Sequence, residues 1–297
     1  METDQLIELT ESFPTLSQHI ADLADFVKTP QPRARTGYAS LDDLILGPAN
    51  GEIALILGRS YTGKSMFIHN MMLNYPTPPG FLVFSMEMPA RALVTRMAAA
   101  WMGTDHSQML VDQARGMMSD QLHGFGRDFD HHVIIEDPAS LKEMSGYLFL
   151  YRQRFGCDPA AVIVDYLELI KTDPKQSGWE RTENLARSMK VWAKDEHIPV
   201  WLVHQSNMRR QLWEKPNEES AKGAGYREAD VVVGIHKPAR DPDLTEGERQ
   251  ALANVINVDV IKNRINGKDT WSSLEFELTP SLRLVDRKGG QLDANII

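Results

Sequence analysis

The 297-residue sequence has a single cysteine, no long apolar run and no excess of basic residues. With Cys157 alone, an internal disulfide is impossible, and we expect this thiol to be a partly buried small side chain without a catalytic role. No segment approaches the roughly 20 apolar residues that cross a membrane, and the acidic first residues are unlike a basic secretory signal. We therefore expect a cytoplasmic protein that binds no membrane.

The net charge of -9 argues against a protein that coats nucleic acid with its whole surface. Lysine and arginine are nevertheless concentrated in a few short stretches, where we would look for a local nucleic-acid groove. A content of 42% hydrophobic and 25% charged residues suits one large α/β domain with a sizeable core.

The strongest motif is a phosphate-binding loop, or P-loop, of the form G-x-x-x-x-G-K-[ST]. It lies between the apolar run 53–57 and the helix-like segment 66–73. In such a loop, backbone N–H groups and a helix N-terminus converge on the phosphates, the lysine adds a positive charge and the hydroxyl ligates Mg²⁺. The sequence therefore predicts a site for ATP and Mg²⁺. The loop consists of Gly58, Arg59, Ser60, Tyr61, Thr62, Gly63, Lys64 and Ser65.

Strand-like apolar runs alternate with helical segments from residue 36 onward, which predicts an α/β fold with a mainly parallel sheet between helices. The last runs are separated by short polar turns, so we expect antiparallel strands at the C-terminal end. Before residue 36, Pro14 divides two short helical stretches, and a Pro-rich linker follows them. The expected strands are 53–57, 81–85, 133–135, 162–165, 200–203, 231–235, 255–261, 272–277 and 282–285.

Three polar residues follow predicted strands and suit the chemistry of a P-loop ATPase. Asp165 ends an apolar strand, where an acid can hold Mg²⁺ through water, because parallel strands end beside the nucleotide. Glu87 either activates the attacking water or complements a helix dipole, and the residues alone leave these interpretations balanced. Gln205 can sense the γ-phosphate and report it to the basic loop 206–227, whose length favours a function.

Two cations, Lys262 and Arg264, lie where a strand gives way to an Asn-Gly turn. At an exposed edge they could reach the γ-phosphate of a neighbouring subunit, as an arginine finger does. They could equally protect an edge strand against aggregation.

The order of these segments resembles the C-terminal ATPase domain of DnaB-type replicative helicases, a branch of the RecA-like fold. The resemblance covers roughly residues 36–286, and several motifs in the right order are more specific than any one of them. They are Thr36-Gly37-Tyr38, the P-loop, Phe84-Ser85-Met86-Glu87-Met88-Pro89, Ile135-Glu136-Asp137, Val164-Asp165-Tyr166-Leu167, His204-Gln205-Ser206-Asn207, Ala229-Asp230-Val231-Val232 and the turn with Lys262 and Arg264.

The resemblance implies a role for each matching residue. These roles are phosphate and Mg²⁺ binding for Lys64 and Ser65, Mg²⁺ support for Asp165, base catalysis for Glu87, coupling of the γ-phosphate to DNA for Gln205, and action in trans at a subunit interface for Lys262 and Arg264. In the family, two loops of the ATPase domain face a central channel and track single-stranded DNA. The basic residues in the corresponding loops are Lys171, Lys175, Arg181, Arg209, Arg210, Lys215 and Lys222.

The resemblance further implies a homo-hexameric ring that moves on single-stranded DNA during replication, in a bacterial or phage-infected cytoplasm, with a loader or primase as a further partner. Residues 36–297 would form the ATPase domain. The segment 1–35 leaves no room for a primase-interacting domain, so we expect a stand-alone motor of phage or plasmid type in which this segment docks on the next subunit. The P-loop interior and the extra Ile265 in the cation turn are unusual for these helicases.

Two other functions stay open at this point. A RecA-type recombination, repair or loading protein would assemble on DNA with ATP and not unwind it, and the fold alone does not distinguish it from a helicase. A nuclease on the same scaffold has weaker support, because its acids are better explained as a loop followed by a strand end. Those acids are Asp128, Asp130, Glu136 and Asp137.

Overall fold

The computed structural model of the protein describes residues 15–287, apart from 27, 29–32, 118, 166–168, 172–177, 207–210, 222–224 and 268–271. The chain divides into two compact units, Met1–Pro32 and Arg33–Ile297. In the first unit the structure describes one helix, α2 (Leu16–Phe26), on which Leu16, Ile20 and Leu23 are exposed. Among the described helices, none combines the length and the apolar character that crossing a membrane requires.

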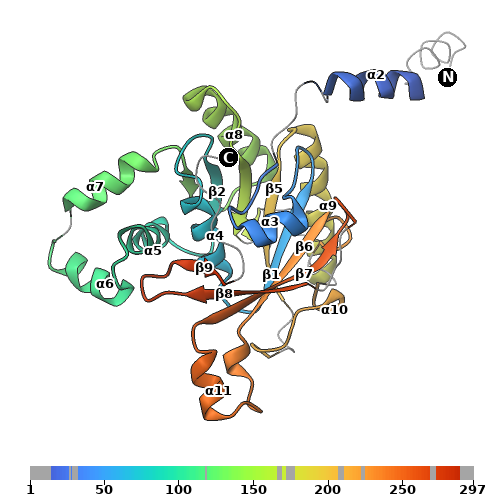
Figure 1. Ribbon diagram of the computed structural model, residues 1–297. Helices are drawn as coiled ribbons and strands as arrows, with labels where there is room; N and C mark the ends of the chain where they lie inside the picture. The colour runs from blue at the N-terminus through green and yellow to red at the C-terminus, as the bar shows by residue number, and fades with distance from the viewer. Residues whose placement is uncertain are drawn as a thin grey trace, which may run out of the picture. The chain divides into compact units, whose positions relative to one another are not determined.

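The described part of the second unit is a nine-stranded sheet flanked by helices (Figure 1). Its strands are β1 (Ile53–Gly58), β2 (Phe81–Ser85), β3 (Val133–Ile135), β4 (Ala161–Asp165), β5 (Val200–Gln205), β6 (Val231–His236), β7 (Val255–Asn263), β8 (Ser273–Leu278) and β9 (Leu284–Asp286). Its helices are α3 (Ala39–Ile45), α4 (Lys64–Leu73), α5 (Ala90–Met102), α6 (His106–Ala114), α7 (Ser119–Asp128), α8 (Leu141–Phe155), α9 (Gly178–Asp195), α10 (Glu218–Ala221) and α11 (Glu246–Ala251), with a 3-10 turn η2 (Pro238–Arg240).

The strand order is β3-β2-β4-β5-β1-β6-β7-β8-β9. Neighbours from β3 to β6 are parallel, whereas β6, β7, β8 and β9 pair antiparallel. This confirms the predicted α/β fold with a mainly parallel sheet and an antiparallel C-terminal end. The carboxyl ends of the parallel strands therefore meet at one edge of the sheet, and β7 ends at the opposite edge.

Both faces of the parallel strands are buried, as their continuous apolar runs predict. Successive side chains of a strand point to opposite faces. On β1, Ile53, Leu55 and Leu57 join the apolar cluster of α8 and α9, whereas Ala54 and Ile56 join the cluster of α3, α4 and α5. The sheet is thus the middle layer of three, and functional groups can emerge only at its edges.

Three expectations from the sequence were wrong. Cys157 is exposed, because it follows Gly156, the left-handed residue that ends α8 at the surface. β7 is an interior strand between β6 and β8, so Lys262 does not protect an edge strand and is only 8% exposed. β9 begins two residues later than predicted, because Leu282 has a φ of 66° and belongs to the preceding turn. The first of the two N-terminal helical stretches lies outside the described residues.

Candidate nucleotide-binding site

The P-loop connects β1 to α4 and folds closely around the carboxyl end of β1. α4 begins at Lys64, directly after its N-cap Gly63, so the unpaired N–H groups of its first turn lie at the loop. Gly58 has to be a glycine, because a Cβ atom there would lie 2.7 Å from the carbonyl oxygen of Ile235. A tight loop that leads into a helix N-terminus is well suited to hold phosphate groups.

Lys64 is folded back onto its own loop. Its Nζ donates hydrogen bonds of 2.8 Å to the carbonyl oxygens of Gly58 and Arg59, and the side chain is buried. Tyr61, in the middle of the loop, has a φ of 66° and is 89% exposed. A left-handed conformation is strained for a bulky residue, so the loop stores backbone strain where it faces solvent.

The register of the sheet brings the other predicted nucleotide-site residues to the same edge. Gly58 pairs with Gln205 across β1 and β5, and Ser85 pairs with Asp165 across β2 and β4. Glu87 lies two residues beyond β2 and is exposed. Its negative charge is close enough to Asp165 to raise the pKa of that carboxyl.

Asp165 is a buried carboxylate that is short of donors. It is 2% exposed, and neither of its side-chain oxygens has a hydrogen-bond partner of normal geometry among the described residues. Burial raises its pKa to about 6, and the charge of Glu87 adds to this rise, whereas Lys64 and the Ser65 hydroxyl oppose it. A buried charge without close partners costs free energy, so the site is short of positive charge and suits a cation.

Ser60 makes a contact that the sequence did not reveal. Its hydroxyl accepts a hydrogen bond from the Gln205 side-chain amide, which joins the P-loop to the end of β5. The contact depends on the pairing of Gly58 with Gln205, and strands so far apart in the sequence carry no local signal of their partner. A second group that was missed, around Asp259, did leave a signal, because a carboxylate interrupts the apolar run of β7.

Lys262 and Arg264 lie at the opposite edge of the sheet from the P-loop. Asn263 pairs with Val231, which in turn pairs with Ala54 at the start of β1. Four residues separate Ala54 from Gly58, so the two cations lie on the order of 15 Å from the P-loop along the sheet, at about 3.3 Å per residue. Neither cation belongs to the nucleotide site of its own chain.

The two cations differ in their surroundings. The Nζ of Lys262 lies 4.7 Å from the centre of the Tyr226 ring and donates to the carbonyl oxygens of Tyr226 and Arg227. Burial lowers the pKa of Lys262 to about 8, and the charge of Arg264 lowers it further. Arg264 is exposed and donates one 3.1 Å hydrogen bond, also to Arg227. Arg264 is therefore the cation that is better placed to reach another molecule.

A family model, the DnaB-like helicase C terminal domain, matches residues 34–280. The chain belongs to this family. It is 25% identical over 244 residues to the replicative DNA helicase DnaB of Buchnera aphidicola subsp. Acyrthosiphon pisum, a match that covers 77% of this chain and 51% of the relative. It is 25% identical over 217 residues to the replicative DNA helicase DnaB of Haemophilus influenzae, covering 68% of this chain and 46% of the relative.

The chain thus spans about half the length of the curated relatives that it matches. Solved structures of the family share its fold. A separately solved helicase ATPase domain superimposes with a TM-score of 0.74 at 15% identity, over 95% of this chain and 100% of that chain. A DnaB-like replicative helicase, whose interactions with primase are described with its structure, also gives a TM-score of 0.74, at 14% identity, over 93% of this chain and 68% of that chain.

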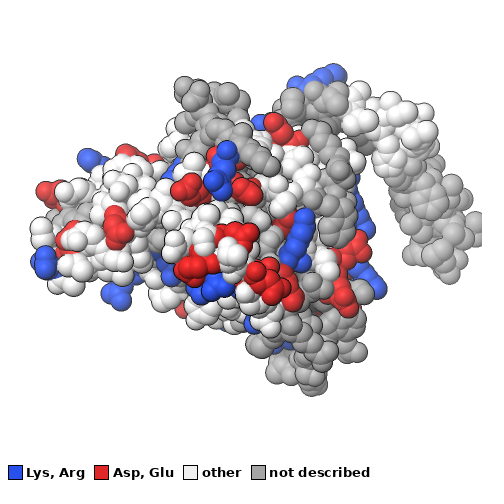
Figure 2. Space-filling view, turned by 60° about the horizontal axis from the view of Figure 1, so that its bottom comes forward, with Lys and Arg blue, Asp and Glu red and all other residues white. Residues whose placement is uncertain are grey.

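The candidate DNA-binding residues are only partly described. Lys175, Arg209, Arg210 and Lys222 lie outside the described residues. The other three contact their own chain, Lys171 through Glu143 at 3.3 Å, Arg181 through the Ile170 carbonyl oxygen at 3.2 Å and Lys215 through Asp259 at 2.9 Å. On the face in Figure 2, acidic and basic side chains are interspersed, and the described residues there form no broad basic area.

The acids that could support a nuclease have structural roles where the structure pairs them. Asp130 forms a 3.1 Å ion pair with Arg154, and Glu136 accepts a hydrogen bond from the Ala90 N–H at the start of α5. Within the described part of the chain, no group of three or more potential ligands is arranged to hold a metal ion. These observations give the nuclease hypothesis no further support.

Replacing Asp165 with asparagine should stabilise the nucleotide-free protein at neutral pH. Because the pKa of Asp165 is raised from 3.8 to about 6, its ionised form penalises the folded state above pH 6. The Asp165→Asn variant should therefore gain up to about 3 kcal/mol in free energy of unfolding at pH 7.5, at 1.36 kcal/mol per pKa unit. The gain should shrink between pH 6 and 4 and vanish below that range.

Urea unfolding of both proteins at several pH values measures this difference. Asp130→Asn is a matched control, because Asp130 is an exposed carboxylate in a surface ion pair, and its replacement should change the stability by less than about 1 kcal/mol. A loss of stability in Asp165→Asn at pH 7.5 would mean that the carboxylate has stabilising partners in the free protein.

Proposed function

We propose that the protein is an ATP-driven helicase that moves on single-stranded DNA in replication, in the cytoplasm, as a homo-hexameric ring. The observation that carries this proposal is that the nucleotide site and the exposed Arg264 lie at opposite edges of one sheet, in a chain of the DnaB-like family. A subunit arranged in this way needs a neighbour to complete its site.

ATP and Mg²⁺ fit the residues present. The P-loop would hold the phosphates, with the Nζ of Lys64 exchanging its two carbonyl contacts for phosphate oxygens. The Ser65 hydroxyl and, through water, Asp165 would hold Mg²⁺, which accounts for the two buried carboxylate oxygens that have no hydrogen-bond partner among the described residues. The metal supplies charge neutralisation on the transferred phosphate.

Glu87 is the proposed catalytic base. It is exposed at the rim of the site, on the same side as Asp165, where a carboxylate can accept the proton of an attacking water. Gln205 is the proposed sensor of the γ-phosphate. One N–H of its amide is fixed by Ser60, which leaves the amide oxygen and the second N–H for the nucleotide.

Lys262 and Arg264 are proposed to act in trans on the nucleotide of the next subunit. Arg264 is exposed and would reach across the interface, while the buried Lys262 supports the turn from beneath through the carbonyl oxygens of Tyr226 and Arg227. An arginine finger stabilises the charge that develops on the transferred phosphate. Hydrolysis would then depend on assembly.

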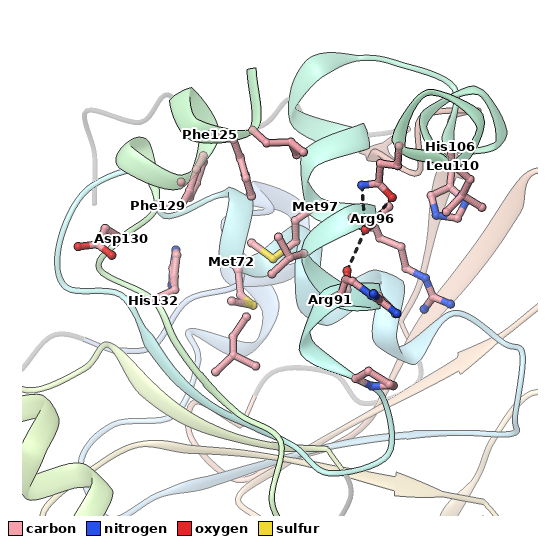
Figure 3. A pocket seen from close by; sticks show the side chains of 18 of the residues that line it. Met72, Arg91, Arg96, Met97, His106, Leu110, Phe125, Phe129, Asp130 and His132 are labelled. Carbon is pink, nitrogen blue, oxygen red and sulfur yellow. Dashed lines mark hydrogen bonds between the residues drawn. The ribbon is translucent and has the colours of Figure 1, made fainter. Parts of the chain in front are cut away.

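Self-association has a second source in helix α2. Its apolar side chains Leu16, Ile20 and Leu23 recur at helical spacing and are all exposed. We propose that this helix docks on a neighbouring copy, in the cavity of about 1150 Å³ that α5, α6 and α7 enclose. The cavity is shown in Figure 3, where the side chains of Met97 and Phe125 point toward its interior.

The charges of helix and cavity are complementary. The sequence of α2 contains two aspartates and neither lysine nor arginine. Two cationic side chains, Arg91 and Arg96, line one side of the cavity (Figure 3). An apolar face flanked by acids therefore fits an apolar cavity flanked by bases. A loader or a primase is a further proposed partner of the ring.

The central test is ATP hydrolysis with and without single-stranded DNA, beside light-scattering mass in the same buffer and a strand-displacement assay. A helicase ring predicts DNA-stimulated hydrolysis, a ring-sized mass and strand displacement. Lys64→Ala should abolish nucleotide binding or hydrolysis, whereas Glu87→Gln should bind ATP and lose about 10²- to 10⁴-fold in turnover. DNA-stimulated hydrolysis without displacement would favour the recombination or repair function, and a monomer indifferent to DNA would contradict both.

Arg264→Ala should inhibit wild-type protein when the two are mixed. A variant subunit can still offer its own P-loop but cannot serve its neighbour, so the variant alone should lose about 10³-fold or more in turnover. A mixture should therefore fall below the activity of its wild-type fraction. Arg287→Ala is the matched control, since Arg287 forms only a partly exposed pair with Glu275. Additive activity in mixtures would assign Arg264 a role within its own chain.

Ile20→Asp should reduce the light-scattering mass, because it places a charge in the middle of the apolar face of α2. Leu110→Asp in the cavity should have the same effect from the partner's side. Ala21→Asp, which adds the same charge elsewhere on the helix, is the control and should leave the mass unchanged. If all three variants keep the wild-type mass, α2 has another role.

A further inference from the structure

Asp259 is a carboxylate in the middle of an otherwise apolar stretch of β7, and it is completely buried. Its two oxygens have different partners. Lys215 Nζ lies 2.9 Å from Oδ1, and His236 Nδ1 lies 2.9 Å from Oδ2. Asp259 thus joins the loop after β5, which carries Lys215, to the end of β6, which carries His236.

The segment 211–216 of that loop lies against the sheet beside this cluster. The N–H of Lys237 donates a 3.1 Å hydrogen bond to the carbonyl oxygen of Leu212. Gly234, which pairs with Asp259, leaves room for Pro216, because a Cβ atom on Gly234 would lie 2.8 Å from the Pro216 ring. A backbone contact, a close apolar contact and an ion pair therefore hold one short segment in place.

The same segment is adjacent to the P-loop. Ile235 on β6 pairs with Gly58, the first residue of the P-loop. Side chains from the P-loop, from the end of β6 and from the segment line one small cavity between them. They include Arg59, Thr62, Ser206, Leu212, Pro216 and His236. A shift of the P-loop is thus felt first by the segment 211–216.

Stability alone is a poor explanation for this cluster. Burying a carboxylate and its partners costs desolvation, and apolar side chains of similar volume often stabilise a protein as well or better. Burial alone would raise the pKa of Asp259, but the contacts with His236 and Lys215 outweigh it and lower the pKa. The carboxylate is therefore kept ionised, and it demands that Lys215 stay where it is.

We propose that Asp259 is a positioning residue which, through Lys215 and His236, fixes the segment 211–216 beside the P-loop and so couples the nucleotide site to the loop 206–227. This inference rests on the proposed function, since it assumes that the loop responds to DNA. Lys215, which the sequence suggested as a DNA contact, then serves as an internal anchor. The DNA-responsive part of the loop would be elsewhere in 206–227.

The test compares Asp259→Asn, Lys215→Met and Lys215→Arg with the wild-type chain. Asp259→Asn and Lys215→Met remove one side of the ion pair, whereas Lys215→Arg keeps it. We expect the first two to retain basal ATP hydrolysis and the KM for ATP within about twofold and to lose about tenfold in stimulation by single-stranded DNA. Lys215→Arg should keep most of the stimulation. Arg287→Met, in a surface pair distant in sequence from the loop, should behave as wild type.

Hydrogen exchange of residues 206–227, measured with and without Mg-ADP, tests the coupling without DNA. Mg-ADP should slow exchange in the wild-type segment 211–216, and this protection should be lost in Asp259→Asn and Lys215→Met. Equal protection in all proteins, or DNA stimulation that survives in both variants, would overturn the inference. If DNA does not stimulate even the wild type but the protection differs as expected, the proposed function fails while the coupling stands.

Discussion

The chemistry of this protein depends on the parallel pairing of β1 with β5 and of β2 with β4. Parallel strands end at the same edge, so pairing of Gly58 with Gln205 and of Ser85 with Asp165 gathers the P-loop, an amide and a carboxylate at one place. A shift by a single residue would turn each of these side chains to the other face of the sheet. The apolar clusters on both faces fix the register and thereby fix the site.

The antiparallel strand β7 has the opposite effect. Because it runs back along β6, it carries Lys262 and Arg264 away from the nucleotide edge. One sheet therefore presents a phosphate site at one edge and an exposed cation at the other. Such an arrangement favours a head-to-tail assembly, since each subunit offers what the nucleotide of its neighbour lacks.

The sequence predicted the fold and most of the nucleotide site, because both leave local signals. Apolar runs marked the strands to within a few residues, and the P-loop has a motif of its own. What the sequence could not predict depends on contacts between distant segments. Ser60 meets Gln205 only through the strand register, and the burial of Lys262 follows from β8, which makes β7 an interior strand. Asp259 left a visible interruption in an apolar run, but its partners come from two other segments.

Three buried carboxylates show why a raised pKa alone does not identify a cation site. Burial raises the pKa of both Asp42 and Asp165 to about 6. Asp42, however, accepts hydrogen bonds from the N–H groups of Thr36 and Gly37 and from the Thr36 hydroxyl, so its charge is satisfied within the fold. Asp259 is satisfied by a cation of its own chain. Only Asp165, of these three, has both oxygens buried with neither a hydrogen bond nor an ion pair to the described residues, and it lies beside the P-loop. The unsatisfied acceptors, more than the pKa, therefore distinguish a carboxylate that awaits a bound cation from one that holds the fold together.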